Sequence, residues 1–108
     1  MNLLAVYTTV ADAASAQHLA QLAVGKGLAA CVQMEHIHST YLWQGQVQSE
    51  PEVRLLFKTT EAAWPALRDC IAQHHPYELP AIFALPVQHA TAAYAQWVQS
   101  LTTPNQKP

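Results

Sequence analysis

Two adjacent histidines, His74 and His75, are the side chains of this 108-residue chain best suited to binding a transition metal. Imidazole nitrogen binds copper, zinc and nickel, and copper forms the tightest complexes among these divalent ions. Both histidines follow a stretch of helical periodicity, which offers them another role. One imidazole can cap the last carbonyls of the helix while the other lies on the surface. We favour this structural role over metal binding for the two histidines. In an oligomer, however, the same weak ligand is present in every subunit, and several copies together can still form a site.

The remaining histidines give weaker indications. His36 and His38 lie two residues apart on a predicted strand, so their side chains point to the same side. This spacing permits chelation, but two polar residues on a solvent-facing strand are the simpler interpretation. His18 and His89 are isolated in the sequence and predict no site.

The two cysteines, Cys31 and Cys70, form neither a CxxC motif nor a disulfide framework. Cys31 lies in an apolar strand, on the face opposite Ala30 and Val32. There it is either a packing residue between subunits or a soft metal ligand. Cys70 falls on the buried stripe of a predicted helix. In a reducing compartment both are most simply small apolar residues.

Lys58, Tyr77 and Glu78 are candidates for a polar cleft between subunits. Leu56 and Phe57 precede Lys58, so its ammonium group is expected to be partly desolvated. The alternative is an ion pair that pins the fold or the interface, and it is favoured because no second carboxylate or nucleophile accompanies these residues. The sequence contains no Ser-His-Asp set, P-loop or GxGxxG motif, so we do not expect an enzyme.

Composition excludes two classes of partner. Charged residues make up 11% of the chain, against about 25% in a typical soluble domain. The five Lys and Arg residues are scattered and the net charge is −2, so no basic surface for nucleic acid is expected. No apolar run approaches the ~20 residues that cross a membrane. The first residues lack the basic and apolar regions of a signal peptide, and we expect a cytoplasmic protein.

The first half of the chain predicts a strand, a helix and a long hairpin. A strand over residues 3–9 precedes a helix that Asp12 caps and that Gly25 and Gly27 end. Its apolar face comprises Ala16, Leu19, Ala20, Ala23 and Val24. The hairpin runs from Ala30, turns at Gln44-Gly45 and returns through a strand with Val53, Leu55, Phe57 and Thr59 on one face.

Two features of the hairpin suggest irregularity. The apolar alternation of residues 30–43 slips by one position near Glu35-His36, which predicts a bulge or bend. Pro51 in the return strand implies an edge position or a bulge.

The second half predicts a helix, a strand and a last helix. Thr60 is expected to cap the first helix, whose buried stripe includes Trp64, Leu67 and Ile71. A strand over residues 80–86 follows. The last helix has its apolar residues at helical spacing, and they are Tyr94, Trp97, Val98 and Leu101. Trp64 and Trp97 are expected to anchor the core.

This order of elements is typical of a ferredoxin-like α+β fold, with helices on one face of an antiparallel sheet. About 13 hairpin residues at ~3.3 Å each span roughly 40 Å, whereas a domain of this length has a radius of gyration of only ~13 Å. The tip, with Tyr41 and Trp43, is therefore expected to project and to contact another subunit. The alternative is a hairpin that curls back onto its own sheet.

Several segments in matching order resemble the CutA family of divalent-cation tolerance proteins, over nearly the whole chain. They are Ala29-Ala30-Cys31-Val32-Gln33, Ser39 through Gly45, Glu52 through Thr59, His75-Pro76-Tyr77-Glu78 with Pro80, Leu85-Pro86-Val87 and Tyr94-Ala95-Gln96-Trp97. The resemblance implies a tight homotrimer shaped like the PII signalling proteins, with Tyr41 and Trp43 as anchors between subunits. It also implies an association with copper and other divalent cations.

The chain departs from the family at positions that matter for metal binding. Ala81 stands where the family commonly has Glu, and Tyr7 stands where some members have Cys. Gln88-His89-Ala90 replaces a common glycine after the Leu-Pro-Val segment. The lost carboxylate and thiol remove two candidate ligands.

The combined expectation is one domain over residues 1–102 followed by a flexible tail, residues 103–108. We expect a trimeric, cytoplasmic protein that binds copper or another divalent cation weakly and requires no cofactor, with His74, His75 and Cys31 as candidate ligands. The alternative is a PII-like trimeric scaffold or small-ligand sensor that uses clefts between subunits.

Overall fold

A computed structural model describes residues 2–102, so the expected tail over residues 103–108 lies outside the described part of the chain. The elements, in order, are β1 (Leu3–Val10), α1 (Ala13–Gly25), β2 (Cys31–Trp43), β3 (Gln46–Thr60), α2 (Trp64–His74), β4 (Ile82–Val87) and α3 (Ala92–Leu101). The strands form one antiparallel sheet in the order β2-β3-β1-β4. This confirms the ferredoxin-like α+β prediction.

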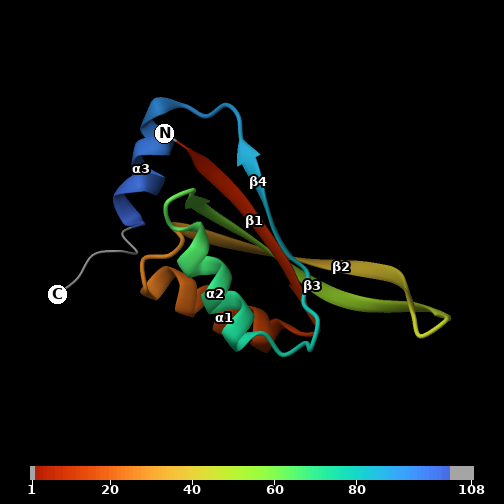
Figure 1. Cartoon of the computed structure of the whole chain (residues 1–108). Coiled ribbons are helices and arrows are strands. Elements are labelled where there is room, and N and C mark those ends of the chain that lie inside the picture. The colour runs from red at the N-terminus through yellow and green to blue at the C-terminus, as the bar shows by residue number, and fades with distance from the viewer. Residues whose placement is uncertain (1, 103–108) are drawn as a thin grey trace.

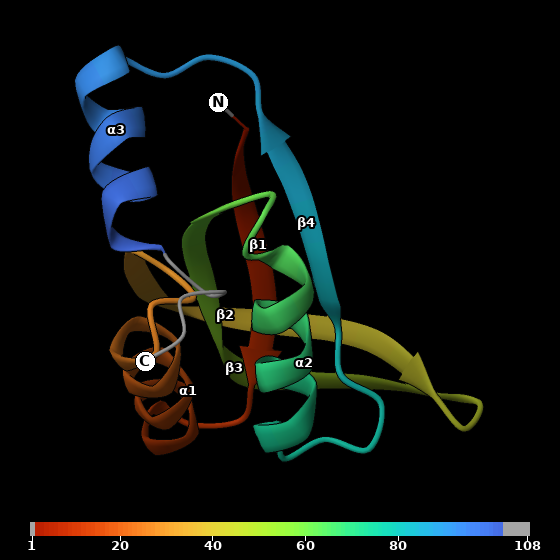
Figure 2. The same cartoon turned by 60° about the vertical axis from the view of Figure 1, so that its left-hand side comes forward.

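The helices divide the sheet into a covered and an open face. α1 and α2 lie side by side across one face (Figure 2). α3 contacts β1 and β3 at the end of the sheet where β1 begins, and its Ala95 and Val98 pack with Leu3 and Ala30. We call the face turned away from α1 and α2 the open face. The prediction that the helices share one face therefore holds for α1 and α2 alone.

The main core lies between the covered face and these two helices. Val53, Leu55 and Phe57 of β3 are buried there, as their alternation predicts. Asp12 caps α1, because its side chain accepts a hydrogen bond from the Ser15 amide at 2.8 Å. The expected face of α1 is buried except for Val24, which is exposed.

The hairpin of β2 and β3 projects from the body (Figure 1), and the molecule measures 45 × 32 × 20 Å. Its two-residue turn is the predicted one, since Gln44 and Gly45 both have positive φ, 50° and 80°. Pairing of β1 with β3 stops at Val10 and Val53, so the hairpin beyond that point has no third strand. The alternative of a hairpin curled onto its own sheet is wrong.

The predicted bulge near Glu35-His36 is also wrong. β2 and β3 pair without interruption from Cys31 opposite Lys58 to Trp43 opposite Gln46. His36 lies opposite Val53, and Val53 is the β3 residue nearest the hairpin tip that still pairs with β1. The apolar pattern therefore changes face where the covered body ends, while the backbone register continues unchanged.

Pro51 lies beyond this boundary, opposite His38. That part of β3 has β2 on one side and no strand of the described chain on the other. Pro51 thus occupies the predicted edge position, without a bulge.

The second half differs from expectation at Thr60, which does not cap α2, and at Trp97. α2 begins at Trp64, after a turn in which the Thr60 hydroxyl accepts from the Ala63 amide at 3.3 Å. Pro65 stands in the first turn of α2, where its missing N–H costs no helical bond. Trp64 packs against the core as predicted, but Trp97 is 45% exposed and is not a core anchor of its own chain.

No helix among the described residues combines the length and apolar character needed to cross a membrane.

Candidate functional site

His75 uses both ring nitrogens within its own chain. Nδ1 accepts a hydrogen bond from the Tyr77 amide at 3.1 Å, so the proton of the neutral ring is on Nε2. Nε2 donates to the Thr9 carbonyl at 3.0 Å and lies 3.0 Å from the Thr8 hydroxyl. Burial lowers the pKa of His75, which favours this neutral form. The side chain ties the segment after α2 to β1 and has no free nitrogen for a metal.

His74 is arranged differently. Its Nδ1 donates to the Cys70 carbonyl at 3.0 Å, so this histidine caps α2 as the structural interpretation predicts. The bond places the proton on Nδ1 and leaves a lone pair on Nε2. His74 therefore keeps one nitrogen available for a ligand.

Cys31 lies away from both histidines within one protomer. It is opposite Lys58, which in turn is opposite Ala5. His75 contacts Thr8 and Thr9, three to four residues further along β1, or roughly 10–13 Å at ~3.3 Å per residue. Among the described residues, no group of three or more His, Cys, Asp or Glu side chains converges. One subunit thus does not assemble the predicted set.

The predicted cleft residues occupy two separate hollows of one protomer. Lys58 lies on the open face, with its Nζ 5.6 Å from the centroid of the Tyr94 ring. That distance suits a cation–π contact. Tyr77 and Glu78 line a different pocket, beside the base of the hairpin. Residues of different subunits would have to supply the two halves of a shared cleft.

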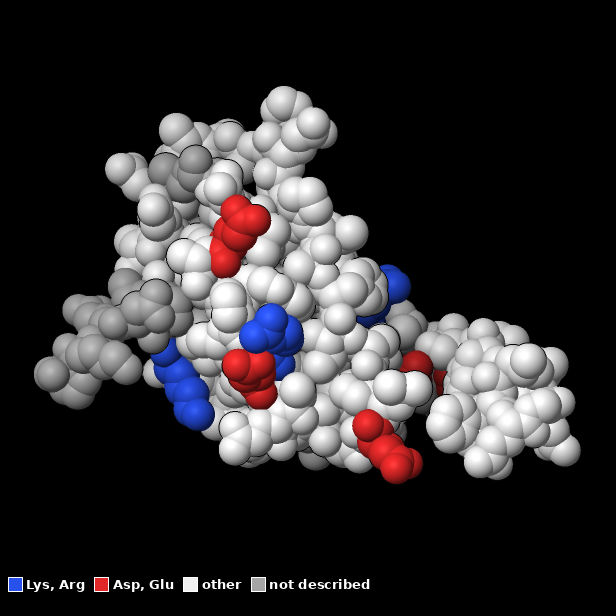
Figure 3. Space-filling view, viewed as in Figure 1, with Lys and Arg blue, Asp and Glu red and all other residues white. Residues whose placement is uncertain are grey.

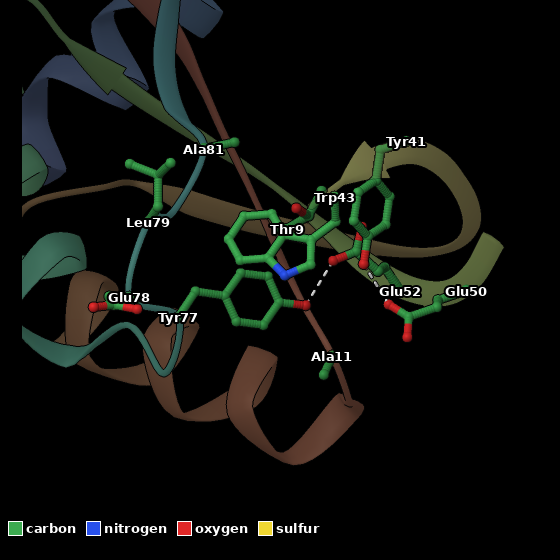
Figure 4. A pocket seen from close by; sticks show the side chains of 10 residues that line it. All are labelled: Thr9, Ala11, Tyr41, Trp43, Glu50, Glu52, Tyr77, Glu78, Leu79 and Ala81. Carbon is green, nitrogen blue, oxygen red and sulfur yellow. Dashed lines mark hydrogen bonds between the residues drawn. The ribbon is translucent and has the colours of Figure 1, made fainter. Parts of the chain in front are cut away.

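The pocket beside the hairpin has a volume of about 480 Å³. Figure 4 shows its side chains, which come from the end of β1, the hairpin and the segment between α2 and β4. The lining residues are Thr9, Ala11, Tyr41, Trp43, Glu50, Glu52, Tyr77, Glu78, Leu79 and Ala81. None of these residues is basic, so the pocket combines aromatic rings with carboxylates.

Two tyrosine–glutamate hydrogen bonds shape this pocket. The Tyr77 hydroxyl donates to Glu52 Oε2 at 2.6 Å, and the Tyr41 hydroxyl donates to Glu50 Oε1 at 2.6 Å. Burial, followed by the bond to Glu52, raises the pKa of Tyr77. The bond to Glu50 is the main cause that raises the pKa of Tyr41. Both phenols therefore stay protonated at neutral pH.

Sequence reasoning did not identify Glu50 and Glu52 as site residues. The available signal was their register, because Glu50 and Glu52 lie opposite Ser39 and Ile37 of β2, on the same face of the hairpin as Tyr41. The contact with Tyr77 depends on how the segment after α2 folds over the hairpin base, which no local pattern encodes.

The two departures that remove a candidate ligand, Ala81 and Tyr7, are apolar or aromatic in the structure. Ala81 lines the pocket, where a methyl group replaces a carboxylate. The ring of Tyr7 stacks on Phe83 on the open face, with centroids 5.4 Å apart. Neither position supplies a metal ligand of the expected kind here.

Comparison with known proteins identifies the family. The family model of the CutA1 divalent ion tolerance protein matches residues 4–101. The Divalent-cation tolerance protein CutA of Yersinia pestis (strain Pestoides F) is 41% identical over 100 residues, which cover 92% of this chain and 84% of that protein.

Solved structures agree in fold. CutA from Synechococcus elongatus PCC7942 has a TM-score of 0.92 at 40% identity, covering 94% of this chain and 91% of that one. CutA1 from Oryza sativa has a TM-score of 0.92 at 33% identity, covering 95% of each chain. On the sequence match and the shared architecture, this chain belongs to the CutA1 divalent ion tolerance protein family.

Proposed function

We propose that this protein is a homotrimer that supports tolerance of divalent cations by binding them weakly, copper first, without catalysing a reaction. The observation that carries the proposal is the orientation of His74. Its Nδ1 donates to the Cys70 carbonyl, which leaves Nε2 as an imidazole ligand of the kind copper prefers. Membership in a divalent ion tolerance family supports the same role. We place the protein in the cytoplasm, where the two free thiols of Cys31 and Cys70 stay reduced.

Of the other predicted ligands, Cys31 is proposed as a metal ligand only at a contact between subunits. Its side chain lies on the open face, which we assign to the trimer interface. His75 acts as a positioning residue, because its hydrogen bonds to Thr9 and Tyr77 hold the segment that follows His74.

The open face supports the proposed trimer. Phe83, Leu85 and Val87 of β4 are exposed apolar side chains there, next to Tyr7. Contiguous exposed apolar surface on a small protein usually marks an association site. The CutA resemblance implies a homotrimer, and we propose that this homotrimer buries the open face.

The hairpin supports the trimer independently. Residues 37–49 contain no Asp, Glu, Lys or Arg, and the projecting part of the molecule is almost free of charge in Figure 3. Trp43 is 49% exposed and Val47 is 74% exposed. We therefore propose Tyr41 and Trp43 as anchors between subunits. The same symmetry would bring Lys58 of one subunit toward Tyr77 and Glu78 of another.

Copper titration tests the metal-binding proposal. We expect calorimetry to detect saturable Cu²⁺ binding by the wild-type trimer and binding at least tenfold weaker in His74→Gln. His89→Gln is the matched control, because His89 is exposed and contacts no proposed ligand. The proposal fails if the wild-type protein shows no saturable binding, or if His74→Gln binds copper as tightly as the control.

A second function is favoured by the pocket beside the hairpin. Its aromatic rings and its carboxylates, among them Glu50, Glu52 and Glu78, suit a small organic cation, which gains from cation–π contacts and charge pairing. The protein would then act as a PII-like small-ligand sensor or scaffold.

Thermal-shift measurements test this second function with a series of organic amines and matched carboxylic acids. The ligand-sensor proposal predicts stabilisation by amines alone, and a loss of that stabilisation in Glu52→Gln. Equal shifts for amines and acids, or no shift at all, would exclude an organic cation as the ligand.

A further inference from the structure

His18 of α1 and His74 at the end of α2 bring two imidazole rings together between the helices. Their ring centroids are 6.0 Å apart, and the ring planes meet at 70°. His18 is exposed and His74 is half-buried. The sequence did not indicate this pair, because the residues lie on different helices and far apart in the chain.

The orientation of His74 suits a metal ligand. Histidines that bind metals usually donate the N–H of the other ring nitrogen to a carbonyl or carboxylate, which fixes the tautomer and the ring plane. His74 donates its Nδ1 proton to the Cys70 carbonyl at 3.0 Å in this way. The lone pair on Nε2 is thereby held at the boundary between α1 and α2.

The separation of the rings also suits a shared ion. With metal–nitrogen distances of about 2.0–2.1 Å, an ion lies roughly 3.2 Å from each ring centroid. Two rings on one ion then have centroids roughly 4.5–6 Å apart for bond angles of about 90–140°. The observed 6.0 Å is at the wide end of this range. A small rotation of the exposed His18 side chain would shorten this distance.

The surroundings favour a particular class of ion. α1 contains no charged residue. The charged residues of α2, Arg68 and Asp69, bind each other at 3.0 Å. Among the described residues, no third His, Cys, Asp or Glu side chain joins the pair. The two imidazoles are therefore the proposed protein ligands, and such a site selects copper, nickel or zinc over magnesium and calcium.

We propose that His18 and His74 form a two-imidazole site for a borderline divalent cation, with Cu²⁺ bound most tightly, that bridges α1 and α2. Water completes the coordination, which accounts for weak binding. This inference rests on the proposed metal-binding function and assigns it a location, on the helix-covered side of the sheet. The ion also joins the two helices, so the folded protein gains thermal stability when the ion binds.

The test compares His18→Gln, His74→Gln and the double variant with His89→Gln as control, all as full-length protein. Copper binding is followed by calorimetry and by electron paramagnetic resonance, with Ni²⁺, Zn²⁺ and Mg²⁺ titrated in parallel. We expect one Cu²⁺ per chain, a spectrum with two coupled nitrogens, and a rise in melting temperature with Cu²⁺ and little with Mg²⁺. Each single variant should bind copper at least tenfold more weakly, and the double variant, which lacks both imidazoles, should show no saturable binding.

The outcomes separate this inference from the broader proposal. Saturable copper binding that survives His18→Gln unchanged overturns the two-histidine site and leaves metal binding by the protein intact. Absence of saturable binding in the wild type overturns both. Circular dichroism of each variant shows that the fold is retained, which the exposure of His18 favours.

Discussion

In the body of the sheet, β3 buries Val53, Leu55 and Phe57 beneath α1 and α2. Earlier in the same strand, Val47 is 74% exposed, and in the facing strand Leu42 is 68% exposed and Trp43 is 49% exposed. The backbone pairing is identical in both regions, since β2 and β3 keep one register throughout. The two regions differ in what lies against the strands.

This contrast explains the apparent slip in the apolar pattern. In the body, the apolar residues of the strands contact the chain's own helices. In the hairpin, which no helix of the described chain reaches, we assign the contacts of the apolar residues to other subunits. A change of apolar face within a regular strand can thus mark the boundary between a core and an interface.

The largest expected effect is in the body. Phe57 is completely buried, so Phe57→Ala should lower the free energy of unfolding by about 3–5 kcal/mol. Val24→Ala is the matched variant on the solvent side of α1, where the side chain is 45% exposed, and it should cost less than about 0.5 kcal/mol. Urea denaturation at fixed protein concentration measures both. Equal losses below about 1 kcal/mol would contradict the placement of the core.

The second effect is in the hairpin. If Trp43 is an anchor between subunits, Trp43→Ala should weaken association by at least about 2 kcal/mol, or about 30-fold. Sedimentation of serial dilutions measures this loss, while circular dichroism should show an intact protomer. Gln21→Ala on the exposed side of α1 is the control. Unchanged association in Trp43→Ala would remove this residue from the interface.

The third effect concerns the join between body and hairpin, where His75 holds the segment over β1. Burial lowers the pKa of folded His75, so the unfolded chain binds more protons below its pKa of about 6.5. Stability should therefore rise with pH up to about 6.5 and fall as the pH drops toward the lowered folded value. His75→Gln should flatten this dependence and cost about 1 kcal/mol at neutral pH through lost hydrogen bonds.

Urea midpoints between about pH 5 and pH 8 check this prediction. His89→Gln, which alters an exposed histidine, should keep the slope of the wild type. A slope that persists in His75→Gln would show that another group titrates.

The smallest effect comes from two similar hydrogen bonds in different settings. Tyr77 and Tyr41 each donate to a glutamate at 2.6 Å, the first half-buried and the second on the hairpin. Tyr77→Phe should cost about 0.5–1.5 kcal/mol. Tyr41→Phe should cost as much in the assembled trimer, because a partner would exclude water, and almost nothing if the hairpin stays in water. Double-variant denaturation would show whether the two bonds are independent.

Much of the fold was predictable because its signals are local. Alternation in β3, the Asp12 cap and the Gln44-Gly45 turn each report their own backbone conformation. Trp97 was misassigned to the core, because helical spacing shows which residues share a face and gives no information on what covers that face. The order of the elements predicted the ferredoxin-like topology.

The site was less predictable, because its contacts join distant parts of the chain. His74 and His75 are adjacent and have the same chemistry, yet one keeps a free nitrogen and the other has none. Their roles depend on the helix end and on the return of the chain to β1. Glu52 belongs to the site because its carboxylate accepts a hydrogen bond from Tyr77, a residue far from it in the sequence.

The mass of the protein in solution tests the central claim most directly. If the uncharged hairpin and the open face are contact surfaces, light scattering after size-exclusion chromatography should give three times the chain mass of 11.9 kDa. The species should persist at micromolar dilution and shift toward smaller masses in Trp43→Ala. A stable monomer of 11.9 kDa would contradict the account, because the hairpin would then expose its apolar residues to water without a partner.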